Sequence, residues 1–572
     1  MVANNLPTRK SRFDLLPWLI VAVTATLPFI SSLDTPLLGD DIMAVVNSPN
    51  VQGKVDISRI FTTNSWGSVE YYRHIPNFRP LSVLTLAVTR ALAGTDPLPY
   101  KTTNLLLHLV ATLLLLHLLG RVGIPPPVAT LATMVFAVHP IHAEALLFAV
   151  NREEILAAIF LLLMLGLAID RSGLIPADRR KRWTPASLVL LGLVFAMAVL
   201  SKESGATGLI VVPLLLVTWP RGKSRFRAAF MPLAVLMVVF VGYIGLRFMA
   251  LGHLTAGFIP FQDNPLVLAD TGPRLASAMA LVAEAATLLV APLNLSIDYS
   301  WNVLGMPIDG FPARSIVGSL LVLATIVACL LAVGRRPVVA LGLGILVVTY
   351  GLVSNIVFLN SMIFGERLLY LPSVGATVAL AGGLELVQVR AGTTHRLFRL
   401  AVVTVLAAWV MMMGTRSFLR SQDYRTATEL LRSSLAQRPG STRLLVNLGV
   451  ELTGTNRHAE ATALFSQALE IDPLDAEANH NLGVMMAEQG RPGEAAALFQ
   501  RAIQARPGFP KALGAMCLVL ESTGRDEAAL EWCLKAAKRG AKVECALLRL
   551  DSSGQCRSSD LGDSSDDGKE AR

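Results

Sequence analysis

Acidic, basic and histidine side chains gather at the ends of the apolar segments of this sequence. Two aspartates follow the first segment, and the other groups border later ones. The full set is Asp40 and Asp41; Arg79; His139, His142, Glu144 and Arg152; Lys202 and Glu203; and Glu366 and Arg367. Arginine and lysine bind phosphate, and a carboxylate can take a proton from a hydroxyl. These residue types suit the transfer of a sugar from a polyprenyl phosphate. Such a donor would place its phosphate at a membrane surface and its lipid tail between membrane helices.

Each group also has a structural interpretation. The alternatives are a solvated loop start for Asp40 and Asp41, extension to the lipid headgroups for Lys202 and Arg367, and pairing with adjacent cations for Glu203 and Glu366. For His139 and His142, satisfied hydrogen bonds at the interface are favoured over metal ligation, because no third ligand is evident, and we predict no metal site. Ionisable residues at membrane depth are costly, so their joint placement favours a functional site.

The elements that must position these residues are membrane spans. Of the 572 residues, 53% are hydrophobic and only 16% are charged, against about 25% in soluble domains, and the mean hydropathy is +0.55. This composition excludes a single soluble globular protein. We predict eleven spans, near residues 15–33, 99–119, 127–148, 153–170, 186–200, 203–219, 228–249, 314–333, 337–358, 367–388 and 398–415. The first is expected to be a signal anchor, and the apolar runs 80–93 and 276–292 are expected to lie at the interface.

The charge pattern predicts the orientation. The net charge of +9 comes from 50 basic and 41 acidic residues, and basic clusters occur at the N-terminus and at 171–182, 221–227, 335–336 and 390–399. With eleven spans, every cluster faces the cytoplasm. We therefore predict a multi-pass protein of the cytoplasmic (inner) membrane, with a cytoplasmic N-terminus. Its C-terminal part, the polar residues of the site and the loop 34–77 would lie outside.

An internal repeat begins after the membrane domain, which we place at residues 1–415. Gly449, Phe465 and Pro473 recur 34 residues later as Gly483, Phe499 and Pro507, and alanines recur between them. This is the tetratricopeptide spacing, in which a small residue and an aromatic fill the contact between paired helices. We predict a helical solenoid over 421–550 and a disordered tail over 551–572, so the fold class is all-α.

The last repeat has cysteines at two positions of the pattern. Cys517 and Cys533 replace the small residue and the aromatic, and both should face the helix contact. An oxidising compartment would permit a disulfide between them. Two buried thiols acting as small hydrophobes are the favoured alternative. Cys545 and Cys556 are a second candidate pair.

Several stretches together resemble one family. They are Gly39-Asp40-Asp41, Phe78-Arg79-Pro80-Leu81, Phe136-Ala-Val-His139-Pro140-Ile-His142-Ala-Glu144, Leu200-Ser-Lys202-Glu203 and Gly365-Glu366-Arg367-Leu-Leu-Tyr370. In this order, and followed by the repeats, they resemble the transmembrane and tetratricopeptide-repeat O-mannosyltransferases of the glycosyltransferase-C superfamily. The resemblance implies a polytopic helix bundle that uses a polyprenyl-phosphate sugar, inverts the anomeric carbon and carries its catalytic acid in the first external loop.

The resemblance also implies roles for the residues. Asp40 or Asp41 would be catalytic. The donor phosphate would be bound by Arg79, Arg152, Lys202 and Arg367, and the acceptor or supporting contacts would come from His139, His142, Glu144, Glu203 and Glu366. The partners would be a lipid-linked sugar donor, of undecaprenyl type in a bacterium, the surrounding membrane lipids, and a polypeptide held by the repeats. No nucleic acid is expected.

The alternative is a non-catalytic membrane scaffold that uses the repeats to dock envelope-assembly partners. A scaffold does not need Asp40, Asp41 and the predicted phosphate-binding cations on the same side of the membrane. Because the sequence places them there, we favour the enzyme. A transporter would need inverted repeats among the spans, and the sequence has no clear internal symmetry there.

Overall fold

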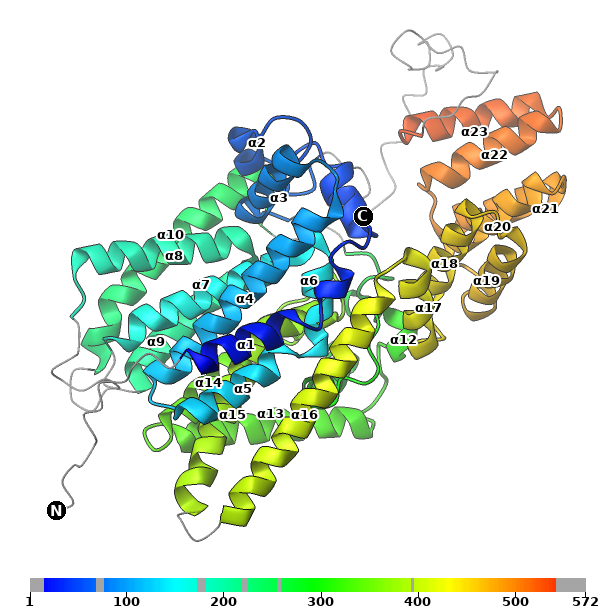
Figure 1. Ribbon diagram of the computed structural model, residues 1–572. Coiled ribbons are helices and arrows are strands. Elements are labelled where there is room, and N and C mark those ends of the chain that lie inside the picture. Colours follow the sequence, from blue (N-terminus) through cyan, green and yellow to red (C-terminus); the bar gives the residue numbers. More distant parts are fainter. Residues whose placement is uncertain are drawn as a thin grey trace, which may run out of the picture. The chain divides into compact units, whose positions relative to one another are not determined.

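The computed structural model describes residues 15–67, 77–171, 182–218, 225–254, 259–391 and 396–541, in which all regular secondary structure is helical (Figure 1). The chain divides into two compact units, Met1–Leu430 and Leu431–Arg572. The predicted all-α fold class is therefore confirmed.

The first unit is a bundle of long helices joined by short turns. Its longer helices are α1 (Leu16–Thr26), α3 (Pro80–Ala93), α4 (Pro97–Arg121), α5 (Pro126–Ala137), α7 (Arg152–Ile169), α8 (Pro185–Ser201), α9 (Gly208–Thr218), α10 (Arg225–Leu251), α11 (Thr271–Val290), α13 (Ala313–Ala332), α14 (Pro337–Val353), α15 (Tyr370–Ala391) and α16 (Arg396–Asp423). Short helices α2 (Ile57–Thr62), α6 (Ala143–Leu147) and α12 (Trp301–Leu304) lie between them. Helices α3, α4, α5, α8 and α14 each have proline in the first turn, where its missing N–H costs nothing.

Several helices have the length and hydropathy of membrane spans. Among the described residues six qualify, or seven when the bent pair Pro126–Ala137 and Pro140–Leu147 is counted as one span, and five further apolar helices are shorter. One of the six is Thr271–Val290, in the region that the charge pattern had assigned to the interface. Its length and hydropathy are sufficient for a membrane span. The count of eleven and the orientation derived from it stay predictions.

Helix α7 lies at the centre of the bundle. Fifteen of its residues are buried, on all sides of the helix, as expected of a helix that is apolar all round. Figure 1 shows α4, α7, α8 and α10 side by side, and the contacts between neighbours agree with this order. By contrast, the apolar windows of α13 and α16 are only 17% and 11% buried, so these helices present apolar side chains to the surroundings.

Small residues allow α14 and α15 to pack closely. A Cβ at Gly342 would lie 2.2 Å from the backbone nitrogen of Ala379, and one at Gly375 would lie 2.4 Å from that of Leu346. Such glycines let helix backbones approach inside membranes. This contact holds α15 against α14, and α15 follows the 3₁₀ turn Glu366–Leu369 that carries Arg367.

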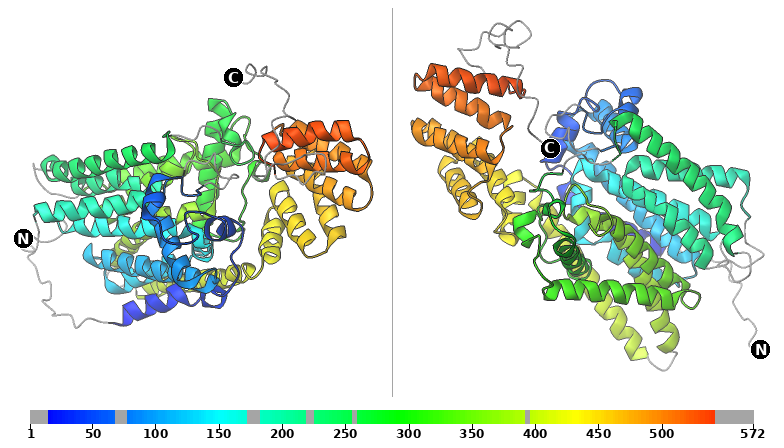
Figure 2. Two further views of the ribbon diagram at one scale, coloured as in Figure 1. Left: turned by 90° about the horizontal axis from the view of Figure 1, so that it is seen from above. Right: turned by 180° about the vertical axis from the view of Figure 1, so that it is seen from behind.

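The second unit is the predicted tetratricopeptide solenoid (Figure 2). Helix α17 (Ala427–Gln437) precedes three helix pairs: α18 (Thr442–Gly454) with α19 (His458–Ile471), α20 (Ala476–Glu488) with α21 (Pro492–Ala505), and α22 (Pro510–Ser522) with α23 (Asp526–Lys538). A Cβ at Gly449 would lie 2.4 Å from the ring of Phe465, and one at Gly483 would lie 2.6 Å from Phe499. The repeat therefore needs glycine opposite phenylalanine.

The third helix pair departs from this arrangement. Cys517 and Cys533 form a disulfide with a Cα–Cα distance of 5.0 Å, so the favoured prediction of two free thiols is wrong. The physical reason is that both cysteines occupy the point of closest approach, where Gly449 and Phe465 meet in the first pair. Cys545, Cys556 and the tail 551–572 lie outside the described residues.

Candidate functional site

Buried and half-buried charges of both signs meet where α7 begins. We call them the six-charge cluster; its members are Arg79, Glu153, Glu154, Lys202, Glu203 and Arg247. Three cations and three carboxylates give it no net charge, which compensates for the cost of burying them. Of these six residues, only Arg79, Lys202 and Glu203 are predicted from the sequence.

Arg79 pairs with two of the three carboxylates in this cluster. Its Nη1 donates to Glu153 Oε1 at 2.5 Å, and its Nε donates to Glu203 Oε2 at 2.8 Å. Burial acts to lower the pKa of Arg79, but the charges of Glu153 and Glu203 outweigh burial and hold that pKa above its ordinary value. The guanidinium is therefore always charged, and two of its nitrogens are already paired with carboxylates.

Lys202 and Arg247 complete the cluster. The Lys202 Nζ lies 3.3 Å from Glu153 Oε1 and also bonds Glu154, and Arg247 Nη1 donates to Glu203 Oε1 at 3.0 Å. Glu153 and Glu154 occupy the first turn of α7, where the helix dipole favours negative charge, and Lys202 caps the C-terminus of α8, where the dipole favours positive charge.

The two neighbouring aspartates have different surroundings. Asp41 is fully buried, and its carboxylate oxygens accept hydrogen bonds from the backbone N–H groups of Ala149 and Val150, both at 2.9 Å. Burial raises the pKa of Asp41 to about 7, although these hydrogen bonds and Lys101 oppose the shift. Asp40 is half-buried. Asp41 therefore fastens the loop to the start of α7.

Arg367 is held by a single carboxylate. Its backbone N–H donates to Glu144 Oε2 and its Nη1 donates to Glu144 Oε1, both at 2.9 Å. The Glu144 side chain is 4% exposed and that of Arg367 is 21% exposed. Asp40 lies close enough to act electrostatically on Arg367. Of the cations predicted to bind phosphate, Arg367 pairs with one carboxylate, whereas Arg79 and Lys202 each pair with two.

A second buried group lies beside this pair. Glu366 Oε1 accepts from the backbone N–H of Ser296 at 2.5 Å and from the Tyr299 hydroxyl at 2.8 Å, and its Oε2 has no partner. Arg420 is fully buried, bonds Asp423 at 3.0 Å and interacts electrostatically with Glu366. Glu366 therefore anchors the 3₁₀ turn that carries Arg367.

Arg152 makes its hydrogen bonds to uncharged groups. It is fully buried, and its Nε donates to Asn104 Oδ1 at 3.0 Å and its Nη2 to the Tyr100 carbonyl at 3.3 Å. Its Nη1 lies 3.3 Å from the hydroxyls of Thr85 and Thr89. These contacts join α3, α4 and α7. Its predicted role at the donor phosphate gains no support from them.

The histidines also lie inside the packed bundle. His139 bonds the Leu289 carbonyl at 3.0 Å, and His142 bonds the Ser373 hydroxyl at 3.0 Å. The His142 ring packs against Phe136 and Tyr370. Within the described residues no group of three or more histidine, cysteine or carboxylate side chains is arranged to hold a metal ion.

Four charged residues of the site were missed from the sequence. Glu153 and Glu154 could have been predicted as site residues, because two acidic residues directly follow Arg152 at the start of an apolar segment. Arg247 lies inside the predicted span 228–249, and a charge there indicates a site by default. Arg420 lies beyond the predicted end of the last span, and no sequence pattern pointed to it.

The fold and the site define a polytopic helical membrane protein with a buried ionic centre and a tetratricopeptide-repeat unit. Tetratricopeptide-repeat family models match residues 415–476, 451–510 and 486–549. Curated relatives are the protein O-mannosyl-transferases F38B6.6 of Caenorhabditis elegans (27% identity over 82% of this chain and 65% of the relative), TMTC4 of Mus musculus (28%, 77% and 65%) and TMTC3 of Homo sapiens (25%, 80% and 51%). The predicted resemblance to this family of O-mannosyltransferases is confirmed.

The chain spans between about half and two thirds of the length of these relatives. Among solved structures, a crystal structure of MamA matches 28% of this chain and 87% of its own, at 19% identity and a TM-score of 0.19.

Proposed function

We propose that this chain is a membrane glycosyltransferase that moves a sugar from a polyprenyl phosphate to a protein hydroxyl. The observation that carries the proposal is the placement of Asp40. This half-buried carboxylate adjoins the anchored Asp41 and interacts with Arg367, so a proton acceptor and a phosphate-binding group lie close together. The relatives are named protein O-mannosyl-transferases, which supports mannose as the sugar and protein as the acceptor.

The reaction is a single displacement at the anomeric carbon. The acceptor oxygen forms a bond to that carbon while the bond to the phosphate oxygen breaks, and the configuration inverts. Asp40 takes the proton of the acceptor hydroxyl. The polyprenyl phosphate leaves with the electron pair of the broken bond, and Arg367 stabilises its negative charge.

The other residues position these two. Asp41 holds the loop through the N–H groups of Ala149 and Val150, and Glu144 fixes both the backbone and the guanidinium of Arg367. Arg79 and Lys202 are compensated by carboxylates. In this proposal they hold the six-charge cluster together and do not contact the phosphate.

We further propose that the reaction takes place on the outer face of the cytoplasmic membrane. The distribution of basic residues supports this side. The solenoid would hold a polypeptide acceptor or a partner protein, as helical repeats present extended concave surfaces.

The test compares two substitutions in the same loop. Membranes containing the full chain, its Asp40→Asn variant or its Asp56→Asn variant are given undecaprenyl-phosphate mannose labelled in the sugar, and label in protein is counted. Asp56 is exposed and only caps α2, and asparagine caps equally well. We expect Asp40→Asn to lose about 10²–10⁴-fold in rate and Asp56→Asn to keep full activity. Unchanged labelling by Asp40→Asn would instead favour a scaffold.

A further inference from the structure

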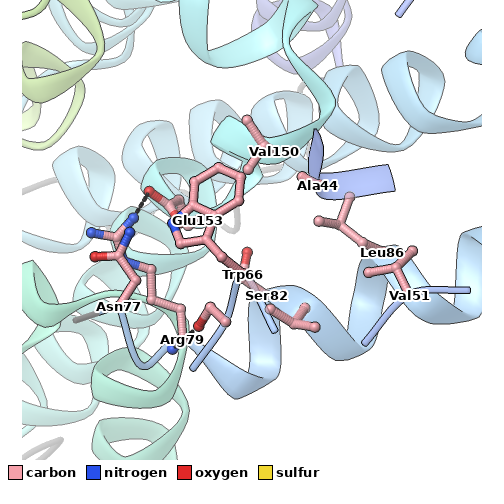
Figure 3. Close-up of a pocket in the computed structure, with 11 residues that line it drawn as sticks. Ala44, Val51, Trp66, Asn77, Arg79, Ser82, Leu86, Val150 and Glu153 are labelled. Atoms are coloured by element: carbon pink, nitrogen blue, oxygen red, sulfur yellow. Dashed lines mark hydrogen bonds and ion pairs between the residues drawn. The ribbon is translucent and has the colours of Figure 1, made fainter. Parts of the chain in front are cut away.

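Two cavities in the described part of the chain differ in the size of molecule that they can hold. The one in Figure 3 lies beside Trp66, Arg79 and Glu153 and has a volume of about 20 Å³, which is enough for a water molecule or two. The other lies between α11 and the start of α13 and has a volume of about 150 Å³, enough for roughly ten water molecules. Of the two, the second has room for a small organic group.

Three segments form the walls of this larger cavity. Helix α11, helix α12 with the loop after it, and the first turn of α13 contribute, in that order, Leu281, Glu284 and Thr287; Leu304 and Met306; and Arg314.

Hydrogen bonds hold these three segments together. The Ser315 hydroxyl of α13 donates to the Ala276 carbonyl of α11 at 2.7 Å, and the backbone N–H of Ile308 donates to the Ser277 hydroxyl at 2.9 Å. The walls therefore keep their positions without a ligand, as they do in most small-molecule sites.

The walls contain one side chain of each charge. Glu284 is half-buried in a helix with the hydropathy of a span, and an acidic residue in such a helix indicates a site by default. Arg314 is exposed, and its Nη2 donates to the Leu304 carbonyl at 3.0 Å, which holds the guanidinium against the cavity. Arginine binds phosphate, and a carboxylate accepts hydrogen bonds from an ammonium group. The pair of charges therefore suits a zwitterion that carries both groups.

The other wall residues favour a primary ammonium over a quaternary one. Quaternary ammonium groups are recognised by aromatic side chains, and the described residues that line the cavity include none. A primary ammonium donates hydrogen bonds, for which Glu284 and Thr287 are acceptors. Leu281, Leu304 and Met306 are buried and suit the methylene groups between the ammonium and the phosphate. The ligand class is therefore phosphoethanolamine and not phosphocholine.

Helix α13 indicates that this group belongs to a lipid. The helix has the length and hydropathy of a membrane span, and its apolar window is only 17% buried. The exposed side chains of Ile316, Val317 and Leu320 follow Arg314 along it. Acyl chains that extend from a headgroup at Arg314 would cover these side chains, which a soluble ligand would leave exposed.

We propose that this cavity binds the headgroup of a membrane phospholipid, phosphatidylethanolamine. Arg314 binds the phosphate, Glu284 and Thr287 bind the ammonium, and the acyl chains lie along α13. None of these residues takes part in the proposed sugar transfer, so the lipid site does not rest on the proposed function.

The test uses native mass spectrometry of the delipidated full chain in detergent micelles. Phosphatidylethanolamine, phosphatidylglycerol and phosphatidylcholine with identical acyl chains are titrated one at a time into the parent, Arg314→Gln and Glu284→Gln. We expect the parent to bind the ethanolamine lipid about tenfold more tightly than the other two, the gain from one charge-assisted hydrogen bond. Arg314→Gln should weaken the binding of all three lipids. Glu284→Gln should remove the preference and leave the binding of the glycerol lipid unchanged.

Matched substitutions elsewhere serve as controls. Arg335 is exposed beyond the other end of α13, and Glu385 is half-buried in α15. Arg335→Gln and Glu385→Gln should bind the three lipids as the parent does. The preference is a ratio of affinities within one variant, so a variant that only folds less well would not lose the preference selectively.

Three results would overturn the proposal. The first is equal affinity of the parent for the three lipids, or a preference that survives Glu284→Gln. The second is displacement of the ethanolamine lipid by soluble phosphoethanolamine at a similar concentration, which would assign the cavity to a soluble ligand. The third is tighter binding of undecaprenyl phosphate than of the ethanolamine lipid, lost in Arg314→Gln, which would assign the cavity to the sugar donor.

Discussion

Glu144 and Arg367 are 223 positions apart in sequence, and one carboxylate binds both the backbone amide and the guanidinium of the arginine, at 2.9 Å each. This relationship fixes the 3₁₀ turn Glu366–Leu369 against α6 and orients the cation that we assign to the donor phosphate. A carboxylate that makes two such bonds to one residue acts as a positioning group.

Replacing Glu144 by Gln should therefore destabilise the chain. The substitution leaves Arg367 without its charge partner, and breaking a buried pair costs about 3–5 kcal/mol, somewhat less here because Arg367 keeps 21% exposure. Thermal unfolding in detergent measures the effect. The control is Glu460→Gln, since Glu460 is 51% exposed in its pair with Arg457 and should cost at most about 1 kcal/mol. Equal shifts in the two variants would contradict the positioning role.

The burial of Asp41 predicts a pH dependence of stability. Its pKa is raised to about 7 in the folded chain from about 3.9 in an unfolded chain. The folded state therefore binds the proton more tightly, and the contribution of Asp41 to stability is lost as the pH rises from about 4 through 7. The melting temperature of the parent, relative to Asp41→Asn, should fall over this range. A constant difference between pH 5 and pH 8 would show that burial does not control this carboxyl.

The sequence predicted what is local and periodic. The 34-residue step located Gly449 and Phe465 because the geometry of the repeat alone requires a small residue opposite an aromatic one. The step also located Cys517 and Cys533, but whether two thiols join depends on how close the helices come, which spacing does not fix. The structure supplies a Cα–Cα distance of 5.0 Å.

Contacts between segments that are distant in the chain could not be predicted from the sequence. Asp40 and Asp41 look equivalent in sequence, and only the fold brings the N–H groups of Ala149 and Val150 to the second of them. Thr271–Val290 has the length and hydropathy of a span, but the parity of the spans depends on each ambiguous helix in turn, so its interfacial placement stays a prediction.

The glycine and phenylalanine found at these positions in the other repeats should stabilise the last helix pair in place of the disulfide. The Cys517→Gly, Cys533→Phe double variant restores the Gly449–Phe465 arrangement, and we expect its last helix pair to resist hydrogen exchange with or without reductant. In the parent, a bridge across 16 residues stabilises by about 3 kcal/mol, so reduction should speed exchange in α22 and α23. Exchange in the parent that ignores reductant would show that the bridge adds nothing.

The predicted orientation can be read by cysteine labelling. Arg335 and Glu488 are both exposed, and they lie in a predicted cytoplasmic loop and in the solenoid. In intact spheroplasts an impermeant maleimide should label Glu488→Cys and leave Arg335→Cys unmodified until the cells are lysed. The reverse pattern would place the solenoid in the cytoplasm.

The central claim is tested most directly with the purified full chain in liposomes that contain undecaprenyl-phosphate mannose labelled in the sugar. Transfer to co-reconstituted envelope proteins is followed for the parent, Arg367→Lys and Arg335→Lys. Since lysine cannot reproduce the planar fork of arginine, we expect Arg367→Lys to raise the KM for the donor by about tenfold or more, the cost of a charge-assisted hydrogen bond, with Arg335→Lys unchanged. Absence of mannose transfer by the parent, or equal donor use by Arg367→Lys and the parent, would contradict the account.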